Sequence, residues 1–250
     1  MTKIVTDSLS SNNESSKREE FYKLFKNCPI PKEELLINVG LFEKRQDFSR
    51  QLFMHELYKK ALSIHGVIME FGTRWGQNMV TLTNLRGILE PYNYTRKIIG
   101  FDTFEGFPVI DEHDGTGSLI KQGSFSVTKD YEKYLKKILA YHESESPLNH
   151  IKKTEIIKGN ASVKLAEYLE KHPETIIALA YFDFDIYQPT KDCLELIKPY
   201  ITKGTIIGFD ELNDIQFPGE TVAVREVLGL KKQAIKRNIY SGKQSYLAID

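Results

Sequence analysis

From residue 66 onward, short apolar runs alternate with stretches in which apolar residues recur at helical spacing. Continuous apolar runs are typical of strands buried on both faces of a sheet, and the helical period indicates covering helices. The runs predict strands at 67–71, 97–101, 155–158, 176–184, 204–209, 233–238 and 245–249. The periodic stretches predict helices at 75–89, 161–171, 190–200 and 221–230. This alternation predicts an α/β fold, with a mostly parallel sheet and helices on both faces.

The beginning of the chain does not follow this alternation. Residues 1–18 are polar and rich in Ser and Asn, which predicts a disordered tail. Residues 19–65 predict an N-terminal helical extension of two helices, separated by a break at Pro29 and Pro31. Residues 66–250 are then expected to form the sheet domain.

The sheet domain carries an insertion at 107–150, between the second and third predicted strands. A polar loop at 111–118 is followed by a Lys- and Tyr-rich helix at about 131–141. Insertions of this kind commonly act as lids or specificity loops, so we expect this one to lie near the functional site.

Composition narrows the possible partners. The chain has 34 basic and 34 acidic residues, so no overall field attracts nucleic acid or an anionic membrane. The longest apolar stretch, 176–182, is too short to span a bilayer, and the polar start is no signal peptide. Cys28 and Cys193 lack metal-site spacing and predict free thiols in a reducing compartment. We therefore expect a soluble cytoplasmic protein without nucleic-acid or membrane partners; an apolar N-terminal helix leaves a homo-oligomer open.

A glycine turn follows the first predicted strand, at residues 70–76. Glycines at such a turn let the backbone bend sharply and approach a ligand closely, and a dinucleotide fingerprint would need a third glycine. The segment resembles motif I of class I methyltransferases, E-x-G-x-x-x-G, whose cofactor is S-adenosylmethionine. The alternative is an ordinary strand-to-helix turn. The resemblance implies these cofactor-binding residues: Glu70, Phe71, Gly72, Thr73 and Gly76.

An aspartate, Asp102, ends the second predicted strand, where an acid can accept both ribose hydroxyls of a nucleoside cofactor. A simple turn aspartate is the alternative. Residues 102–108, Asp-Thr-Phe-Glu-Gly-Phe-Pro, closely resemble the D-[ST]-F-x-G-[LF]-P signature of the macrocin O-methyltransferase (TylF-like) family. Residues 123–127 resemble that family's glycine-phenylalanine-serine-valine segment. The resemblance implies a Rossmann-like class I methyltransferase fold, with Asp102 and Thr103 at the ribose and Asn160 near the adenine.

Four acids follow the fourth and fifth predicted strands: Asp183, Asp185, Asp210 and Glu211. Residues two apart share a strand face, so Asp183 and Asp185 are expected to point into the same crevice. Carboxylates so close together repel unless a cation or a proton resolves them. Helix capping is the alternative role.

These acids resemble the family's L-D-x-D-x-Y segment and its acid pair, usually Asp-Asp, after the fifth strand. The resemblance implies a magnesium ion held by Asp183 with Asp210, Glu211 or both. It also implies that Asp183 touches the cofactor and is the catalytic residue. Asp185 and Tyr187 are candidates for the substrate pocket.

The resemblance thus implies an S-adenosylmethionine-dependent, magnesium-assisted O-methyltransferase. Its partner would be a small molecule, a sugar or nucleotide-sugar, in natural-product or surface-polysaccharide biosynthesis. Methylation of a catechol-type, phosphoryl or nitrogen acceptor is an alternative in the same class. A nicotinamide-dependent oxidoreductase is disfavoured by the missing third glycine and the four acids. A non-catalytic interaction module is disfavoured because clustered carboxylates destabilise a fold without a cation.

Overall fold

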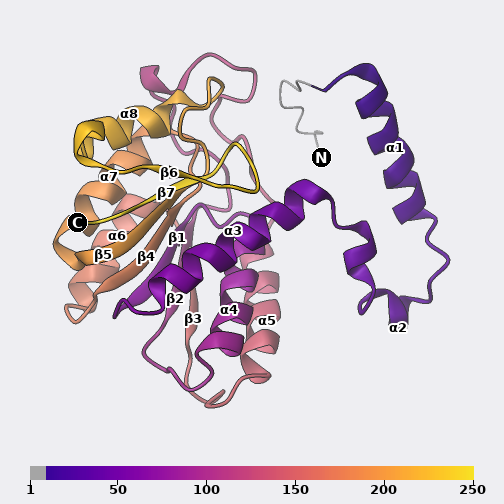
Figure 1. Cartoon of the computed structure of the whole chain (residues 1–250), viewed down its shortest axis with the longest axis horizontal. Coiled ribbons are helices and arrows are strands. Elements are labelled where there is room, and N and C mark those ends of the chain that lie inside the picture. Colours follow the sequence, from indigo (N-terminus) through magenta and orange to yellow (C-terminus); the bar gives the residue numbers. More distant parts are fainter. Residues whose placement is uncertain (1–9) are drawn as a thin grey trace. The chain divides into compact units, whose positions relative to one another are not determined.

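The computed structural model describes residues 10–250, and one mixed sheet organises most of them (Figure 1). Seven strands of this part of the chain follow the order β3-β2-β1-β4-β5-β7-β6. Strands β1 to β5 are parallel, whereas β7 runs antiparallel to β5 and β6 antiparallel to β7. The strands are β1 (Val67–Phe71), β2 (Ile98–Asp102), β3 (Thr154–Lys158), β4 (Ile177–Phe182), β5 (Ile201–Phe209), β6 (Lys236–Arg237) and β7 (Ser245–Ala248). The predicted α/β class with a mostly parallel sheet is confirmed.

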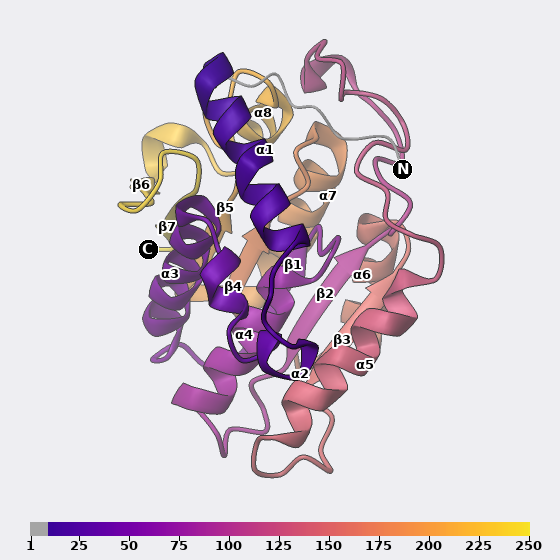
Figure 2. The ribbon, with the colours of Figure 1, turned by 90° about the vertical axis from the view of Figure 1, so that its right-hand side faces the viewer.

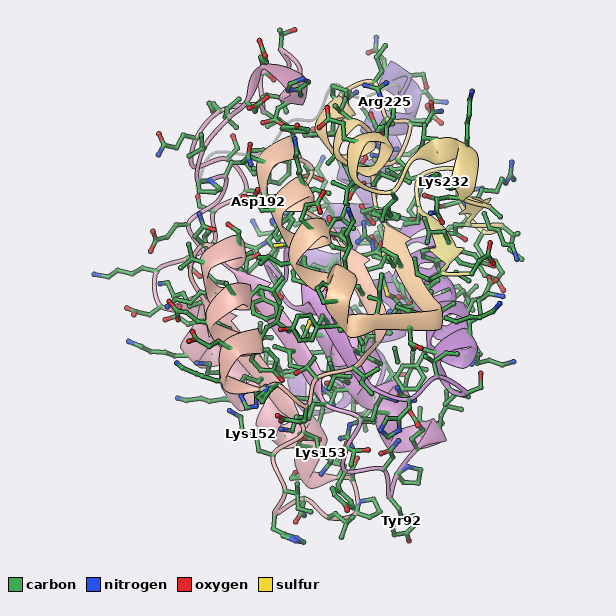
Figure 3. All side chains as sticks on the ribbon, turned by 90° about the vertical axis from the view of Figure 1, so that its left-hand side faces the viewer. Tyr92, Lys152, Lys153, Asp192, Arg225 and Lys232 are labelled. Atoms are coloured by element: carbon green, nitrogen blue, oxygen red, sulfur yellow. The ribbon has the colours of Figure 1, made fainter. Side chains whose placement is uncertain are left out.

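Helices cover both faces of the sheet, as the buried strands require. On one face, α3, α4 and α5 pack through residues such as Leu57, Leu82 and Leu135. On the other face, α6, α7 and α8 pack through residues such as Leu165 and Val224. Figure 3 shows this second face, with Asp192 of α7 and Arg225 of α8 labelled. The helices are α3 (Arg45–Ala61), α4 (Gln77–Leu89), α5 (Tyr131–Ser144), α6 (Ala161–Lys171), α7 (Tyr187–Ile197) and α8 (Pro218–Val227), with short 3₁₀ turns η2 (Glu112–Asp114), η3 (Lys198–Tyr200) and η4 (Leu230–Lys232).

Strand β4 lies between β1 and β5, and all of its residues are buried. It ends at Phe182, two residues before the predicted end. Further along, Asp185 has φ +64°, in the left-handed region, so the chain has left the strand direction there. The early end places Asp183 directly after the strand.

The predicted insertion lies between β2 and β3, but its helix belongs to the core of the fold. Helix α5 lies beside β3 in Figure 2, and its Leu135 and Leu139 are buried in the sheet's core. The segment ahead of α5 packs separately, with Phe107 buried against Ile186 and Phe217. Only this first part of the insertion therefore resembles a loop laid over the end of the sheet.

The chain divides into two compact units, one up to Ser49 and one from Arg50 onward. This division differs from the predicted boundary at residue 66, because α3 contributes Phe53, Met54 and Leu57 to the core over the sheet. No helix within residues 10–250 has both the length and the hydropathy needed to cross a membrane.

The first unit contains α1 (Asn12–Lys26), α2 (Lys32–Leu35) and the 3₁₀ turn η1 (Val39–Phe42). The ring of Phe25 meets that of Phe42 edge-on, with centroids 5.0 Å apart. Helix α1 begins at Asn12 because Ser11 and Glu14 form a capping box. The predicted disordered tail is therefore wrong for residues 12–18, and residues 1–9 lie outside the described part.

Candidate active site

The predicted site residues meet at the edge where the parallel strands end, here called the carboxyl edge. The Gly72 amide donates to the Phe101 carbonyl, the Asp183 amide to Phe71 and the Asp210 amide to Phe182. These bonds extend the sheet by one residue beyond β1, β4 and β5. They align the turn after β1 with the acids after β4 and β5. In open α/β sheets this is where ligands bind.

The turn at residues 70–76, here called the cofactor turn, needs its two glycines. Gly72 has φ +94°, and a Cβ there would lie 2.0 Å from the carbonyl oxygen of Asp183. Gly76 has φ +79°, and a Cβ there would lie 2.4 Å from a methyl carbon of Leu135. The cofactor turn therefore lies directly against the backbone of Asp183.

Two buried polar side chains of the cofactor turn lack partners. Glu70 is 1% exposed, and neither of its carboxylate oxygens has a hydrogen-bond partner among residues 10–250. The hydroxyl of Thr73 is likewise unpaired within the described chain. Burial, and then the nearby Asp183 carboxylate, raises the pKa of Glu70 to about 8, although the neighbouring side chains of Asn78 and Thr73 oppose this shift. Because neither neighbour forms a well-aligned hydrogen bond, the buried acid can still accept from a bound ammonium group, which the amino-acid part of S-adenosylmethionine carries.

Asp102 joins the cofactor turn to the loop after β2. Its two carboxylate oxygens accept from the Arg74 amide at 2.7 Å and from the Phe104 amide at 2.5 Å. Each oxygen keeps a further lone pair for a ribose hydroxyl. The Thr103 hydroxyl donates to the Gly106 carbonyl at 2.8 Å and so shapes this loop.

Phe71 and Asn160 show structural roles. The ring of Phe71 stacks on Phe101 and Phe182 in the core, so only its backbone lies at the site. The side chain of Asn160 caps α6, where its Oδ1 accepts from the Ser162 amide at 3.1 Å. Contact of Asn160 with adenine stays a prediction. Because Oδ1 caps the helix, only the side-chain amide nitrogen could donate a hydrogen bond to the adenine.

Asn160→Ala should lower the free energy of unfolding by about 1 kcal/mol, because the cap of α6 is lost. Asn160→Asp should keep that stability, because a carboxylate oxygen also caps a helix. If the amide nitrogen donates to adenine, both variants should bind S-adenosylhomocysteine more weakly than the wild type. Urea unfolding and calorimetry measure the two effects separately, and unchanged affinity in Asn160→Asp would refute the adenine contact.

The acids after β4 and β5, here called the acid cluster, are Asp183, Asp185, Asp210 and Glu211. Arg50 of α3 joins two of them: its Nη1 lies 2.9 Å from Asp183 Oδ2, and its Nη2 lies 2.7 Å from Asp210 Oδ2. The second oxygen of Asp210 accepts from the Tyr181 hydroxyl at 2.6 Å and from Gln244 at 3.1 Å. Asp210 is thus fully engaged, whereas Asp183 is 23% exposed at its side chain.

The aspartates of the acid cluster have strongly shifted pKa values. Burial and the Asp210 carboxylate raise the pKa of Asp183 to about 7, even though Arg50 opposes this shift. Burial, followed by Asp183 and Asp210, raises the pKa of Asp185 well above its usual value. The pKa of Asp210 is lowered, because Arg50 and the Tyr181 hydroxyl outweigh its burial. Asp183 is thus close enough to Asp185 to raise its pKa. The prediction that the two acids share a strand face is wrong, because β4 ends before Asp183 and Asp185 has a left-handed backbone.

Glu211 is held at the outer side of the acid cluster. Lys243 lies 3.2 Å from Glu211 and 3.3 Å from Asp214. The Glu211 amide donates to Glu220, a fully buried residue of α8 whose other oxygen has no partner within residues 10–250. Burial, with Asp210 and Asp185 nearby, raises the pKa of Glu220 well above its usual value.

Tyr187, predicted as a substrate residue, has its side chain engaged elsewhere. Its hydroxyl donates to Glu226 at 2.7 Å and accepts from Lys191, and its ring lies against His113. Its amide donates to Asp114 of the insertion at 2.5 Å. Tyr187 is the first residue of α7, and its hydrogen bond to Glu226 joins α7 to α8.

Sequence reasoning missed the basic residues and the fifth acid. Arg50 lies 133 positions before Asp183 on a helix whose other residues gave no chemical signal. Lys243 precedes β7 in a polar loop. Glu220 stands in the first turn of α8, where an acid is ordinary. No local pattern relates these positions to the acid cluster.

The donor set of the acid cluster fits magnesium by its chemistry, since Mg²⁺ prefers carboxylate oxygens and water. The arrangement differs from a ready-made metal site. Within residues 10–250, no three acidic, histidine or cysteine side chains are grouped to hold a metal ion. The guanidinium of Arg50 lies between Asp183 and Asp210, the two carboxylates that the sequence predicts as ligands.

Solved structures with the same architecture extend over the whole chain. A crystal structure of CalS11, a calicheamicin methyltransferase, is 41% identical, with a TM-score of 0.92 over 99% of this chain and 98% of that one. This chain belongs to the macrocin O-methyltransferase (TylF-like) family. It is therefore an S-adenosylmethionine-dependent O-methyltransferase, and the nicotinamide-dependent alternative is wrong.

A second structure of CalS11, described as an apo TDP-rhamnose 3′-O-methyltransferase, is 38% identical with a TM-score of 0.83, over 96% of each chain. The O-methyltransferase NovP, 15% identical with a TM-score of 0.60 over 80% of this chain and 79% of its own, shares the fold. No protein-family model and no curated protein matched the chain. Membership of the TylF-like family thus rests on likeness to solved structures along the full length.

Proposed function

We propose that this TylF-like enzyme transfers a methyl group from S-adenosylmethionine to a hydroxyl of a sugar carried on a nucleotide. The observation that supports this best is the contact between the cofactor turn and Asp183. Gly72 lies against the backbone of Asp183, while the side chain of Asp183 faces the acid cluster. The methyl donor and a base would therefore lie side by side. The acceptor class follows the TDP-rhamnose that the CalS11 description names.

The reaction we propose needs one proton acceptor and one aligned oxygen. Asp183 would take the hydroxyl proton as the acceptor oxygen attacks the methyl carbon. The carbon–oxygen bond forms while the carbon–sulfur bond breaks, and its electron pair stays on sulfur, giving a methyl ether and S-adenosylhomocysteine. A carboxylate that lies beside the methyl donor can accept this proton as the new bond forms. Asp185 would line the acceptor side of this pocket.

The cofactor would lie over the ends of β1, β2 and β3. The unpaired carboxylate of Glu70 would hold its ammonium group, and Asp102 would accept from its ribose. Phe71 would contribute only backbone, and Thr73 its free hydroxyl. Gly72 and Gly76 keep the turn close enough for these contacts.

We also propose that Asp183 and Asp210 hold Mg²⁺, with Glu211 as a further candidate ligand. When bound, Mg²⁺ would lower the pKa of the acceptor hydroxyl and orient its oxygen. The repulsion among these buried carboxyl groups raises the pKa of Asp183 and Asp185, and a cation bound there would relieve it in place of a proton. Between Asp210 and Glu211, Asp210 is the stronger candidate ligand. Its carboxylate faces that of Asp183 across Arg50, whereas the Glu211 carboxylate contacts Lys243.

A cytoplasmic location is part of the same proposal. Cys28 and Cys193 are both free thiols, which suits a reducing compartment. A homo-oligomer stays a prediction.

A panel of acceptors tests the proposed function. The enzyme would be incubated with S-adenosylmethionine, Mg²⁺ and either TDP-rhamnose, other nucleotide-sugars, free sugars or a catechol. We expect S-adenosylhomocysteine to form only with nucleotide-sugars, together with a product heavier by one methylene unit. Turnover with the catechol and with none of the sugars would show that the acceptor is a phenol and would contradict the proposed sugar acceptor.

A further inference from the structure

Arg50 takes up one carboxylate oxygen of each of the two residues predicted to hold the metal, Asp183 and Asp210. The second oxygen of Asp210 is already bound by the Tyr181 hydroxyl and by Gln244. Asp210 therefore offers a cation only its Oδ2, and this oxygen lies 2.7 Å from Nη2 of Arg50. The other guanidinium nitrogen lies 2.9 Å from Oδ2 of Asp183. One planar fork thus occupies an oxygen of each predicted ligand.

The backbone on both sides of this bridge is fixed. The amides of Asp183 and Asp210 continue the ladders of the sheet, so these two carboxylates start from rigid positions. Arg50 starts from α3, whose Phe53, Met54 and Leu57 are fully buried over the sheet. The bridge is therefore a built contact, and neither partner needs a backbone movement to make it.

The side chain of Arg50 can still leave. It is 25% exposed, and an arginine side chain has several rotatable bonds by which the guanidinium can turn toward solvent. The guanidinium carries one positive charge, whereas the two carboxylates that it bridges carry two negative charges when both are ionised. A divalent cation would compensate more of this charge, and it would repel a guanidinium that shared its ligand oxygens.

We propose that Arg50 and a divalent cation compete for the Asp183–Asp210 carboxylate pair, so that Arg50 sets how tightly this enzyme binds its metal. This inference rests on the metal part of the proposed function. Arg50 is the counter-ion of the pair before the metal arrives and turns away when the metal binds. The apparent affinity for the metal is reduced by the fraction of molecules in which Arg50 holds the pair.

Titration of the full-length chain with Mn²⁺, followed by electron paramagnetic resonance of the free ion, tests the competition. Arg50→Met keeps an unbranched, largely apolar side chain and removes the guanidinium with its charge. If Arg50 holds the pair in nine molecules of ten, this variant should bind Mn²⁺ about tenfold more tightly than the wild type. Arg50→Gln is a second variant with the same expected direction, should the methionine variant fail to fold.

Lys243→Met is the matched control. It removes one positive charge from the same acid cluster, but Lys243 contacts Glu211 and Asp214 rather than the bridged pair. We expect a much smaller gain in Mn²⁺ affinity for this variant. An equal gain in both variants would show a general effect of charge and would overturn the competition.

The remaining outcomes separate the inference from the function on which it rests. Mn²⁺ binding that is unchanged in Arg50→Met and Arg50→Gln would show that Arg50 does not affect the site, and weaker binding would show that it supports the site. Either result would overturn the competition alone. Absence of Mn²⁺ binding in the wild type and in both Arg50 variants would overturn metal assistance together with the competition. The proposal of methyl transfer to a sugar would stand after either result, since the acceptor panel tests it independently.

Discussion

Asp183→Asn is expected to lower turnover by a factor of about 10²–10⁴, the range typical of a lost general base. Asparagine keeps the shape of the side chain but cannot accept the acceptor's proton, and it is a poorer metal ligand. Affinity for S-adenosylhomocysteine should change far less, because Glu70, Asp102 and the glycines of the cofactor turn remain. Single-turnover kinetics and calorimetry measure the two quantities.

Asp214→Asn is the control for this change. Asp214 lies beside the acid cluster, and Lys243 contacts it, but Arg50 does not. The same loss of one charge should leave turnover close to that of the wild type. Comparable losses in both variants would mean that the overall field, and not Asp183 itself, carries the reaction. Loss of cofactor binding in Asp183→Asn would instead mean that the cofactor and acceptor subsites are placed wrongly.

Gly72→Ala is expected to lower the free energy of unfolding by about 2–5 kcal/mol and to weaken cofactor binding. The left-handed backbone at φ +94° costs a residue with a Cβ about 1–2 kcal/mol. The new methyl group would also lie 2.0 Å from the carbonyl oxygen of Asp183, and overpacking of this kind typically costs about 1–3 kcal/mol more. The Asp183 carbonyl and the Cα that would carry the methyl group cannot yield easily, since both belong to backbone that the sheet's hydrogen bonds hold.

Gly123→Ala isolates the conformational part of this effect. Gly123 has φ +80°, yet a Cβ there would meet nothing within 4 Å. We expect a loss of about 1–2 kcal/mol from this variant in urea unfolding. Equal losses for the two variants would refute the close contact between the cofactor turn and Asp183.

Much of the fold could be predicted because local patterns determine it. Continuous apolar runs such as 67–71 can be buried only in a covered sheet, and each predicted strand of the parallel sheet lies within a few residues of the observed one. Asp102, Asp183 and Asp210 could be found because polar residues directly after such strands must reach the carboxyl edge. Motif resemblance then supplied the chemistry.

Three features could not be predicted, each for a physical reason. The left-handed backbone of Asp185 separates it from the strand direction of β4, and no strand pattern signals such a turn at a non-glycine residue. The capping box of Ser11 and Glu14 starts a helix within a polar stretch that resembles disorder. Arg50 reaches Asp183 only through the packing of α3 on the sheet, which is a tertiary contact.

Transfer of a carbon-13-labelled methyl group tests the proposed function most directly. The wild type and Asp183→Asn would each be incubated with methyl-labelled S-adenosylmethionine, TDP-rhamnose and Mg²⁺, and the product examined by heteronuclear NMR. We expect the labelled carbon to couple through one oxygen to a ring carbon of the sugar in the wild-type product only, with one S-adenosylhomocysteine per methyl ether. A label on the base or the phosphate, or S-adenosylhomocysteine without a labelled sugar, would contradict methyl transfer to a sugar hydroxyl at this site.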